Sequence, residues 1–122
     1  MSLQVRTACL SAGASTVVCL PCDLSQEEQC REAVAAAVRG LGGELKLVDN
    51  NKEVCAGIDI LVNNAGVLLA PGIETISMAD IDTSMDINLK AAVLLSQLCL
   101  PHLIASRGSI VNVSSIGNMH KH

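Results

Sequence analysis

The sequence contains no phenylalanine, tryptophan or tyrosine, although half of its 122 residues are apolar. Aromatic rings usually supply much of the area that a protein core buries. Their complete absence excludes an aromatic core. Any core of this chain must therefore be built from aliphatic side chains.

Charge is also scarce. Only 16% of the residues are charged and the net charge is −4, with eight basic residues scattered between Arg6 and Lys121. Disordered chains combine low hydrophobicity with high net charge, so this composition indicates a globular domain. Nucleic-acid binding requires a basic stripe that neutralises phosphates, and the sequence has none, so no nucleic-acid partner is expected.

Long apolar runs are missing. The most apolar stretch, residues 91–104, is interrupted by Ser96, Gln97, Pro101 and His102 and is shorter than the ~20 residues that span a bilayer. Ser and Thr residues also dilute the N-terminal segment, whereas a signal peptide needs a continuous apolar region. The sequence therefore predicts no transmembrane helix, no membrane partner and a cytoplasmic location.

Six cysteines have irregular spacings and several fall at core positions, which favours reduced thiols over a disulfide framework; they are Cys9, Cys19, Cys22, Cys30, Cys55 and Cys99. Cys19 and Cys22 form a C-x-x-C motif, but reactive pairs of this kind open a helix. Here they lie in or just past a predicted strand and should point to opposite faces. A zinc site that joins this pair to His120 and His122 lacks a second paired knuckle, so no metal is expected.

Residues 16–20 are β-branched and apolar and are closed by Pro21, a pattern that predicts a buried strand. Ser25 and Glu28 then form a capping-box pattern at the start of a helix. That helix has one apolar stripe, and glycines at positions 40, 42 and 43 are expected to end it; the stripe consists of Cys30, Ala33, Val34, Ala37, Val38 and Leu41.

A second strand is predicted at residues 58–62, and a third at residues 109–113. Between them Ser77 and Asp80 give a cap signal for a helix over residues 80–106 that Gly108 ends. The order β-α-β-α-β predicts a parallel sheet covered by helices on both faces, a three-layer α/β/α arrangement. Ligands bind at the carboxyl ends of such strands, where Asp23, Asn63, Asn64, Ser114 and Ser115 would meet.

Residues 44–57 interrupt this rhythm, and an Asp49-Asn50-Asn51 turn between two arms predicts a small inserted hairpin. We find no internal repeat and no low-complexity tract. The whole of residues 1–122 is therefore interpreted as one partial domain.

Three motifs occur in the order found in one enzyme family: residues 58–66, which end in Asn63-Asn64-Ala65-Gly66, then Asn88 within a helix, then residues 108–115. Over residues 15–115 the chain resembles a short-chain dehydrogenase/reductase. The resemblance implies an incomplete Rossmann-like, doubly wound sheet. It also implies NAD or NADP as cofactor and a small-molecule alcohol or carbonyl compound as substrate.

The resemblance implies a role for each matching residue. Asp23 resembles the acid that binds the adenine amino group, with Leu24 beside it. The segment of Asn63, Asn64, Ala65 and Gly66 resembles the one that lies against the adenosine ribose. Asn88 resembles the helix asparagine that kinks its helix and anchors a proton-relay water, and Ser115 the serine that hydrogen-bonds the substrate.

Plainer readings of these residues stay open. Asn88 could be a structural residue that bonds a kinked backbone, and Ser115 could be a turn serine. Asp23 could simply favour the dipole of the helix that follows it.

Parts of the family pattern have no match. No glycine-rich turn precedes Pro21, where Gly13 is the only glycine, and residues 1–14 resemble the tail of the family's second helix. The family places a Tyr and a Lys, four residues apart, downstream of the serine; the Tyr acts as general acid/base. This sequence has no tyrosine, and a proton-transfer role for His120 or His122 is disfavoured because chain ends are usually solvated.

In the family's strand order, 3-2-1-4-5, the strands matching residues 16–20 and 58–62 are not neighbours. Residues 16–20 would therefore expose unpaired backbone groups unless they re-pair with residues 58–62 or another chain covers them. We expect a fragment of an NAD(P)-dependent oxidoreductase that transfers hydride and is inactive by itself. The alternative is a non-catalytic truncated form that associates with a complete family member through the helix at residues 80–106.

Overall fold

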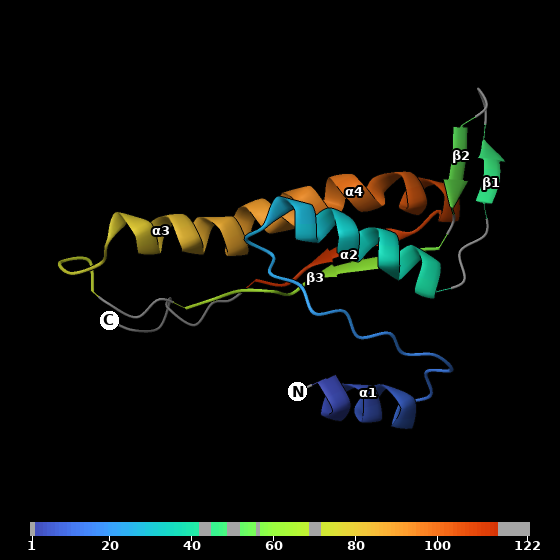
Figure 1. Cartoon of the computed structure of the whole chain (residues 1–122), viewed down its shortest axis with the longest axis horizontal. Helices are drawn as coiled ribbons and strands as arrows, with labels where there is room; N and C mark the ends of the chain where they lie inside the picture. The colour runs from blue at the N-terminus through green and yellow to red at the C-terminus, as the bar shows by residue number, and fades with distance from the viewer. Residues whose placement is uncertain (1, 42–44, 49–51, 56, 69–71, 115–122) are drawn as a thin grey trace.

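The computed structural model describes residues 2–41, 45–48, 52–55, 57–68 and 72–114 (Figure 1). Its helices and strands follow one another along the chain as α1 (Ser2–Ser11), α2 (Glu27–Gly40), β1 (Leu45–Val48), β2 (Lys52–Cys55), β3 (Ile60–Asn63), α3 (Met78–Met85), η1 (Asp86–Lys90), α4 (Ala91–Ser106) and β4 (Ser109–Asn112). β3 and β4 pair in parallel, with Ile60 opposite Ser109 and Asn63 opposite Asn112. β1 and β2 form a separate antiparallel pair.

The predicted strands at residues 58–62 and 109–113 are confirmed as β3 and β4, each shifted by one or two residues at its ends. The predicted hairpin is confirmed as β1 and β2, while its turn at residues 49–51 lies outside the described residues. The helical reading of the N-terminal residues is confirmed by α1, which stands apart from the other helices in Figure 1.

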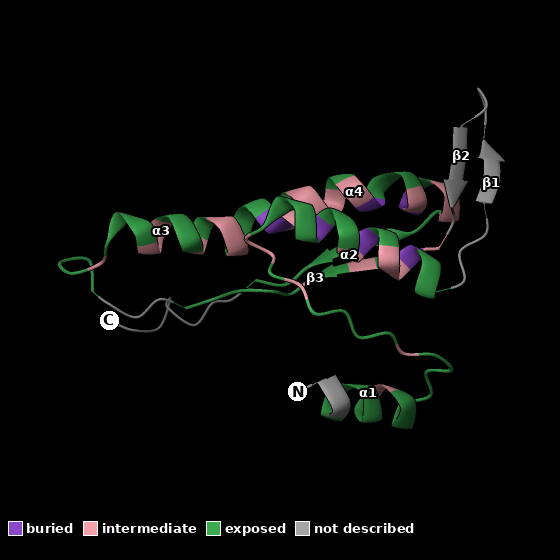
Figure 2. Ribbon diagram, in the orientation of Figure 1, coloured by how far each residue is buried: buried purple, intermediate pink, exposed green. Residues whose placement is uncertain are grey.

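Two helices, α2 and α4, pack against one face of the β3–β4 pair, and their buried residues face inward (Figure 2). The core is small and aliphatic, as the missing aromatics predict; its buried members are Val34, Val38, Ile58, Cys99 and Leu103. On β3 the alternate residues Ile60 and Val62 are 61% and 55% exposed. The described residues thus contain two of the three layers that a complete α/β/α domain has.

Helices α3, η1 and α4 run on without a break from Met78 to Ser106. The predicted cap at Ser77 is confirmed, because its Oγ accepts a hydrogen bond of 3.0 Å from the Asp80 N–H. At the other end Arg107 adopts a left-handed conformation with φ 55° and the Gly108 N–H donates to the Leu103 carbonyl. The Arg107 N–H also donates to the Ile104 carbonyl, and these two bonds make the Schellman type of helix ending.

This 29-residue helix is long enough to cross a membrane, and it contains an 18-residue stretch that is apolar enough, with a mean hydropathy of 1.4. The sequence expectation, which considered only residues 91–104, did not foresee that. Core helices of soluble proteins pass the same test, and Ala91, Cys99 and Leu103 are buried. We interpret it as a core helix, and the absence of a membrane partner stays a prediction.

The predicted strand at residues 16–20 is wrong: this segment belongs to neither of the two sheets among the described residues. It runs as an exposed chain beside α2, where Val18 lies so close to Gly40 that a Cβ on the glycine would be 3.0 Å from Val18 Cγ2. A strand needs a neighbour that takes its backbone hydrogen bonds. The described residues supply none here, which is the outcome that the family's strand order implies.

The predicted capping box at Ser25 is also wrong. α2 begins after Gln26 and has no side-chain cap. The Ser25 backbone N–H and Oγ instead both donate to Asp23 Oδ1, at 3.0 and 2.7 Å. An Asp side chain competes for the backbone two residues ahead of it in an Asx-turn, so the serine hydroxyl is used by the carboxylate and not by the helix.

Gly108 marks the closest approach of backbone to backbone at the start of β4. A Cβ at this position would overlap the Asp59 carbonyl oxygen, which also accepts the Ser109 N–H. Backbone atoms cannot swing aside as a flexible side chain does. Only glycine therefore allows α4 to turn directly into β4.

We expect Gly108→Ala to destabilise the fold by roughly 1–3 kcal/mol, because the added methyl forces β4 away from β3. The measurement is the urea midpoint of unfolding followed by circular dichroism. Gly72→Ala is the matched control, since a Cβ at Gly72 meets nothing within 4 Å. Equal midpoints for the two variants would contradict the close approach of Gly108 to Asp59.

Candidate functional site

Amide side chains meet at the carboxyl ends of β3 and β4. Asn63 Nδ2 donates to Asn112 Oδ1 at 2.9 Å and to Ser96 Oγ at 3.2 Å, and Ser96 Oγ donates to the Ala92 carbonyl at 2.7 Å. Asn63 Oδ1 is buried and has no hydrogen-bond donor among the described residues. The Asn63 amide therefore links both strands to α4, and its Oδ1 can still accept a hydrogen bond.

Asn88 lies in η1, a single π-helical turn in which the Ala91 N–H donates to the Asp86 carbonyl five residues earlier. Its Oδ1 accepts from the Val67 N–H at 2.7 Å. Its Nδ2 donates to the Val67 carbonyl at 3.0 Å and to Ser84 Oγ at 3.0 Å. The side chain therefore clamps the loop after β3 to the helix, and none of these bonds is to the backbone of the π-turn itself.

Gly66 lets this clamp close, because a Cβ there would sit 3.2 Å from Asn88 Oδ1. Few Cβ atoms in proteins lie so close to a neighbouring atom, so a side chain at position 66 would push Asn88 away. The Asn-Asn-Ala-Gly motif and the helix asparagine are thus parts of one contact. A π-turn of this kind often occurs at a functional site.

Asp23 is held at the start of α2. Its carboxylate accepts the two bonds from Ser25, and its own N–H donates to Gln29 Oε1 at 2.8 Å. The hydrogen bond from the Ser25 hydroxyl, and then that from the Ser25 N–H, lower the pKa of the Asp23 carboxyl. The group is therefore an exposed, ionised acceptor at neutral pH.

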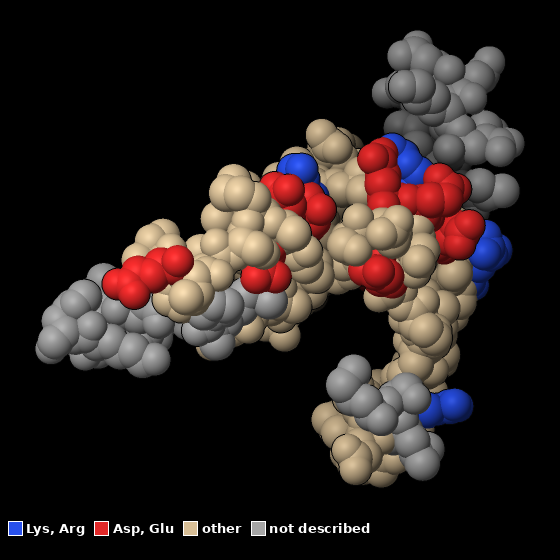
Figure 3. Space-filling model, turned by 60° about the vertical axis from the view of Figure 1, so that its left-hand side comes forward, with Lys and Arg blue, Asp and Glu red and all other residues tan. Residues whose placement is uncertain are grey.

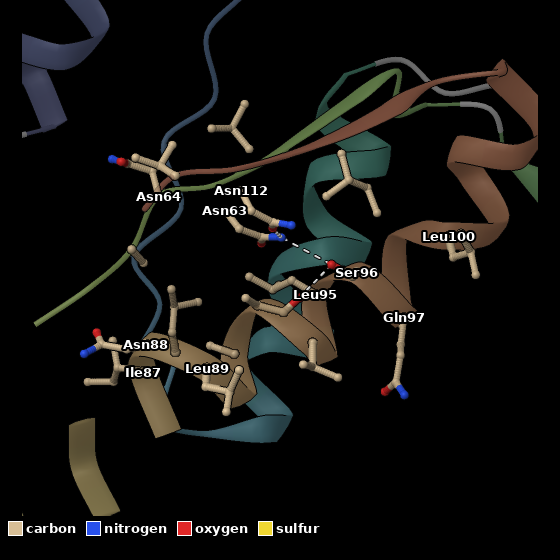
Figure 4. Close-up of a pocket in the computed structure, with 18 residues that line it drawn as sticks. Asn63, Asn64, Ile87, Asn88, Leu89, Leu95, Ser96, Gln97, Leu100 and Asn112 are labelled. Atoms are coloured by element: carbon tan, nitrogen blue, oxygen red, sulfur yellow. Dashed lines mark hydrogen bonds between the residues drawn. The ribbon is translucent and has the colours of Figure 1, made fainter. Parts of the chain in front are cut away.

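A cavity of about 560 Å³ lies between α4 with η1 and the ends of β3 and β4 (Figure 4). It is lined by five of the predicted site residues, namely Leu24, Asn63, Asn64, Ala65 and Asn88. Asp23 and Gly66 adjoin lining residues in the chain. Ser115 lies outside the described residues, and Ser114 is exposed just beyond β4.

Sequence reasoning missed Ser96 and Asn112, which also line the cavity. The sequence contained a signal for each of these two residues. Ser96 interrupts an apolar stretch, and Asn112 is polar inside a strand of apolar residues. Buried polar side chains need hydrogen-bond partners. Ser96, which is half-buried, bonds Asn63, and so does the exposed Asn112.

The lining suits part of a dinucleotide. Amides, a hydroxyl and aliphatic side chains can bind a base and a ribose, and the buried Asn63 Oδ1 is an acceptor for one further donor. Phosphates need cations or a row of backbone N–H groups. No lysine, arginine or histidine lines the cavity, and the face in Figure 3 shows no continuous basic patch.

Comparison with known proteins agrees with this arrangement. The family model described as "short chain dehydrogenase" matches residues 3–121. The chain belongs to the short-chain dehydrogenase family. Its fold is accordingly an incomplete Rossmann-like α/β fold.

Individual short-chain dehydrogenases show how much of the family pattern is present. The chain is 34% identical over 119 residues to hydroxysteroid dehydrogenase-like protein 2 of Danio rerio, covering 95% of this chain and 25% of that protein. It is 33% identical over 100 residues to L-fucose dehydrogenase of Bos taurus, covering 81% of this chain and 32% of that protein.

A crystal structure of a short-chain dehydrogenase from Burkholderia cenocepacia, in complex with NADP, superposes with a TM-score of 0.75 at 26% identity. The match covers 94% of this chain and 40% of that one. The chain thus spans between a quarter and two fifths of the length of these relatives.

We expect Asn88→Ala to release the Val67 loop, because both bonds to the Val67 backbone are lost. At about 1 kcal/mol for each bond, amide exchange at Val67 should accelerate by at least about tenfold in hydrogen-exchange NMR. Ser84→Ala is the control, since it removes one bond of Asn88 but leaves both to Val67. An unchanged Val67 exchange rate in Asn88→Ala would show that the clamp does not hold the loop.

Proposed function

We propose that these residues form the middle part of the NAD(P)-binding domain of a short-chain dehydrogenase that interconverts a small-molecule alcohol and a carbonyl compound. The observation that carries the proposal is the cavity whose wall joins Leu24, from the turn before α2, to Asn64 and Ala65 after β3. Residues of these types, at the carboxyl edge of a parallel sheet, suit an adenosine group.

Each residue has a part in holding that group. The ionised Asp23 would accept a hydrogen bond from the adenine amino group, and Leu24 would pack against the adenine ring. Asn63, Asn64, Ala65 and Gly66 would lie along the ribose, on a loop that Asn88 positions. When NAD or NADP is bound, its nicotinamide supplies the hydride chemistry.

The substrate end of the proposal rests on fewer residues. Ser115 would hydrogen-bond the substrate oxygen, and Asn88 could hold a water in a proton relay through the second lone pair of Oδ1. The 122 residues contain no tyrosine that could serve as the general acid/base and no glycine-rich phosphate loop. We therefore propose that a polypeptide of these residues alone is catalytically inactive.

The test is an NMR titration of the purified chain with 5′-AMP. We expect amide shifts at Leu24, Asn64 and Ala65, with a Kd on the order of 1 mM because the phosphate has no cradle. Asp23→Ala should weaken binding by about three- to tenfold, since it removes a charged acceptor. Asp82→Ala, which removes an exposed carboxylate on α3, is the control.

Shifts confined to other residues, or equal affinity in Asp23→Ala and Asp82→Ala, would refute the adenosine site. Oxidation of NADH or NADPH by a carbonyl compound in the same sample should be undetectable. Turnover that disappears in Ser115→Ala would refute the proposed inactivity.

A second function is favoured by an exposed apolar side of α4 next to the cavity. Val93, Leu100 and Ile104 are 50%, 47% and 68% exposed, and their spacing of seven and four residues places them on one side of the helix. Val93 and Leu100 also line the cavity. A non-catalytic form could use this surface to associate with a second copy or with a complete family member. Among the described residues, none covers this side of α4.

If this surface pairs two copies, the chain will self-associate in sedimentation velocity experiments. Ile104→Glu should then shift it to the monomer, because a charge in an apolar contact costs several kcal/mol. Leu68→Glu is the control, as Leu68 is 84% exposed and lies in the loop after β3 and not on α4. A monomeric wild type at every concentration would dismiss the pairing of two copies.

A further inference from the structure

Two thiols meet where the chain enters α2. The Asp23 N–H donates to Gln29 Oε1 at 2.8 Å, and Cys30 Sγ donates to the Leu24 carbonyl at 3.5 Å. These contacts fold residues 22–24 back against the first turn of α2, with Cys22 beside Cys30. The Cys22 thiol is near enough to Cys30 to raise the pKa of the Cys30 thiol.

The two thiols differ in exposure. Cys30 is fully buried, whereas Cys22 is half-buried and reachable from solvent. Burial, and after it the neighbouring Cys22 thiol, raise the pKa of the Cys30 thiol. Of these two thiols, Cys22 is the one that an oxidant in solution can reach, and Cys30 is a buried, protonated thiol.

We propose that Cys22 and Cys30 are an oxidation site that closes to an intramolecular disulfide when the protein meets a peroxide. The Cys22 sulfur attacks one peroxide oxygen, the O–O bond breaks, and one water leaves as Cys22 becomes a sulfenic acid. The Cys30 sulfur then attacks the Cys22 sulfur, the S–O bond breaks and a second water leaves. Two thiols lose two electrons and two protons, and the peroxide takes up both.

This pair differs from the Cys19 and Cys22 pair that the C-x-x-C spacing brings to notice. Cys19 is exposed on the segment that was predicted to be a strand, three residues before Cys22 and on the far side of Pro21. Neither residue of that motif lies within a helix. The fold, and not the local spacing, selects Cys30 as the partner of Cys22.

The bond would act on a segment that belongs to no sheet. Residues 16–23 pair with no strand among the described residues, and Val18, Asp23 and Leu24 contact α2. A covalent link between Cys22 and Cys30 would pin this segment to α2. The inference concerns the thiols and does not rest on the proposed adenosine site.

The test treats the reduced chain with stoichiometric hydrogen peroxide, blocks the remaining thiols and digests with a protease that cleaves after glutamate. Glu28 and Glu32 flank a peptide that contains Cys30 alone, while Cys9, Cys19 and Cys22 stay on the N-terminal side of Glu27. Mass spectrometry without reductant then shows whether Cys30 is cross-linked. We expect the cross-link in the wild type and in Cys19→Ser, and its loss in Cys22→Ser.

Unfolding provides the second measurement, which does not depend on any variant folding. In concentrated urea the yield of cross-linked Cys30 in the wild type should fall by about tenfold, because the unfolded chain no longer holds the two thiols together. A cross-link that persists in Cys22→Ser, or that vanishes in Cys19→Ser, would overturn the proposal. So would an equal yield in urea, or no cross-link once the accessible thiols are oxidised.

Discussion

The parallel pairing of β3 with β4 joins segments 49 residues apart, and the contact between Asn63 and Asn112 at the cavity depends on it. Three contacts secure the pairing besides the strand hydrogen bonds. Ser106 Oγ donates to the Ile58 carbonyl at 2.8 Å, Gly108 meets the Asp59 backbone, and Asn63 bonds Asn112. Because these contacts lie at both ends of the strands, they fix the register as well as the approach. The amides of the cavity meet only in that register.

A parallel sheet of only these two strands buries little apolar surface. A two-stranded sheet is marginal in water without a helix against it, so the α2 and α4 layer must supply the stability. That layer uses small aliphatic residues, while Ile60 and Val62 on the other face of β3 are exposed. A Rossmann-like sheet buries such residues on both faces. Among the described residues, none covers Ile60 and Val62.

Local sequence signals predicted elements whose partners lie within the chain. The β-branched run at residues 58–62, the cap at Ser77 and the stop at Gly108 all appear in the structure because their contacts are local or meet another predicted element. Residues 16–20 carry an equally good strand pattern and form no strand, because a strand depends on a neighbour that the pattern cannot report. The predicted capping box at Ser25 does not form for a local reason: Asp23, two residues earlier, accepts the hydrogen bond from the Ser25 hydroxyl. The candidate site was predicted from the family motifs, and its internal bonds were beyond prediction because they join residues up to 49 apart.

The Asn88 side chain holds the loop after β3 and still has one acceptor that is not used by the protein. An amide offers two N–H groups and two oxygen lone pairs. Val67 and Ser84 use both N–H groups and one lone pair. One lone pair of Oδ1 is left, beside Gly66 and on the wall of the cavity. The clamp orients that lone pair, because the amide cannot rotate without breaking its bonds to Val67. A water held there would take its position from the loop that follows β3, so the loop and any proton relay would be set by the same three hydrogen bonds.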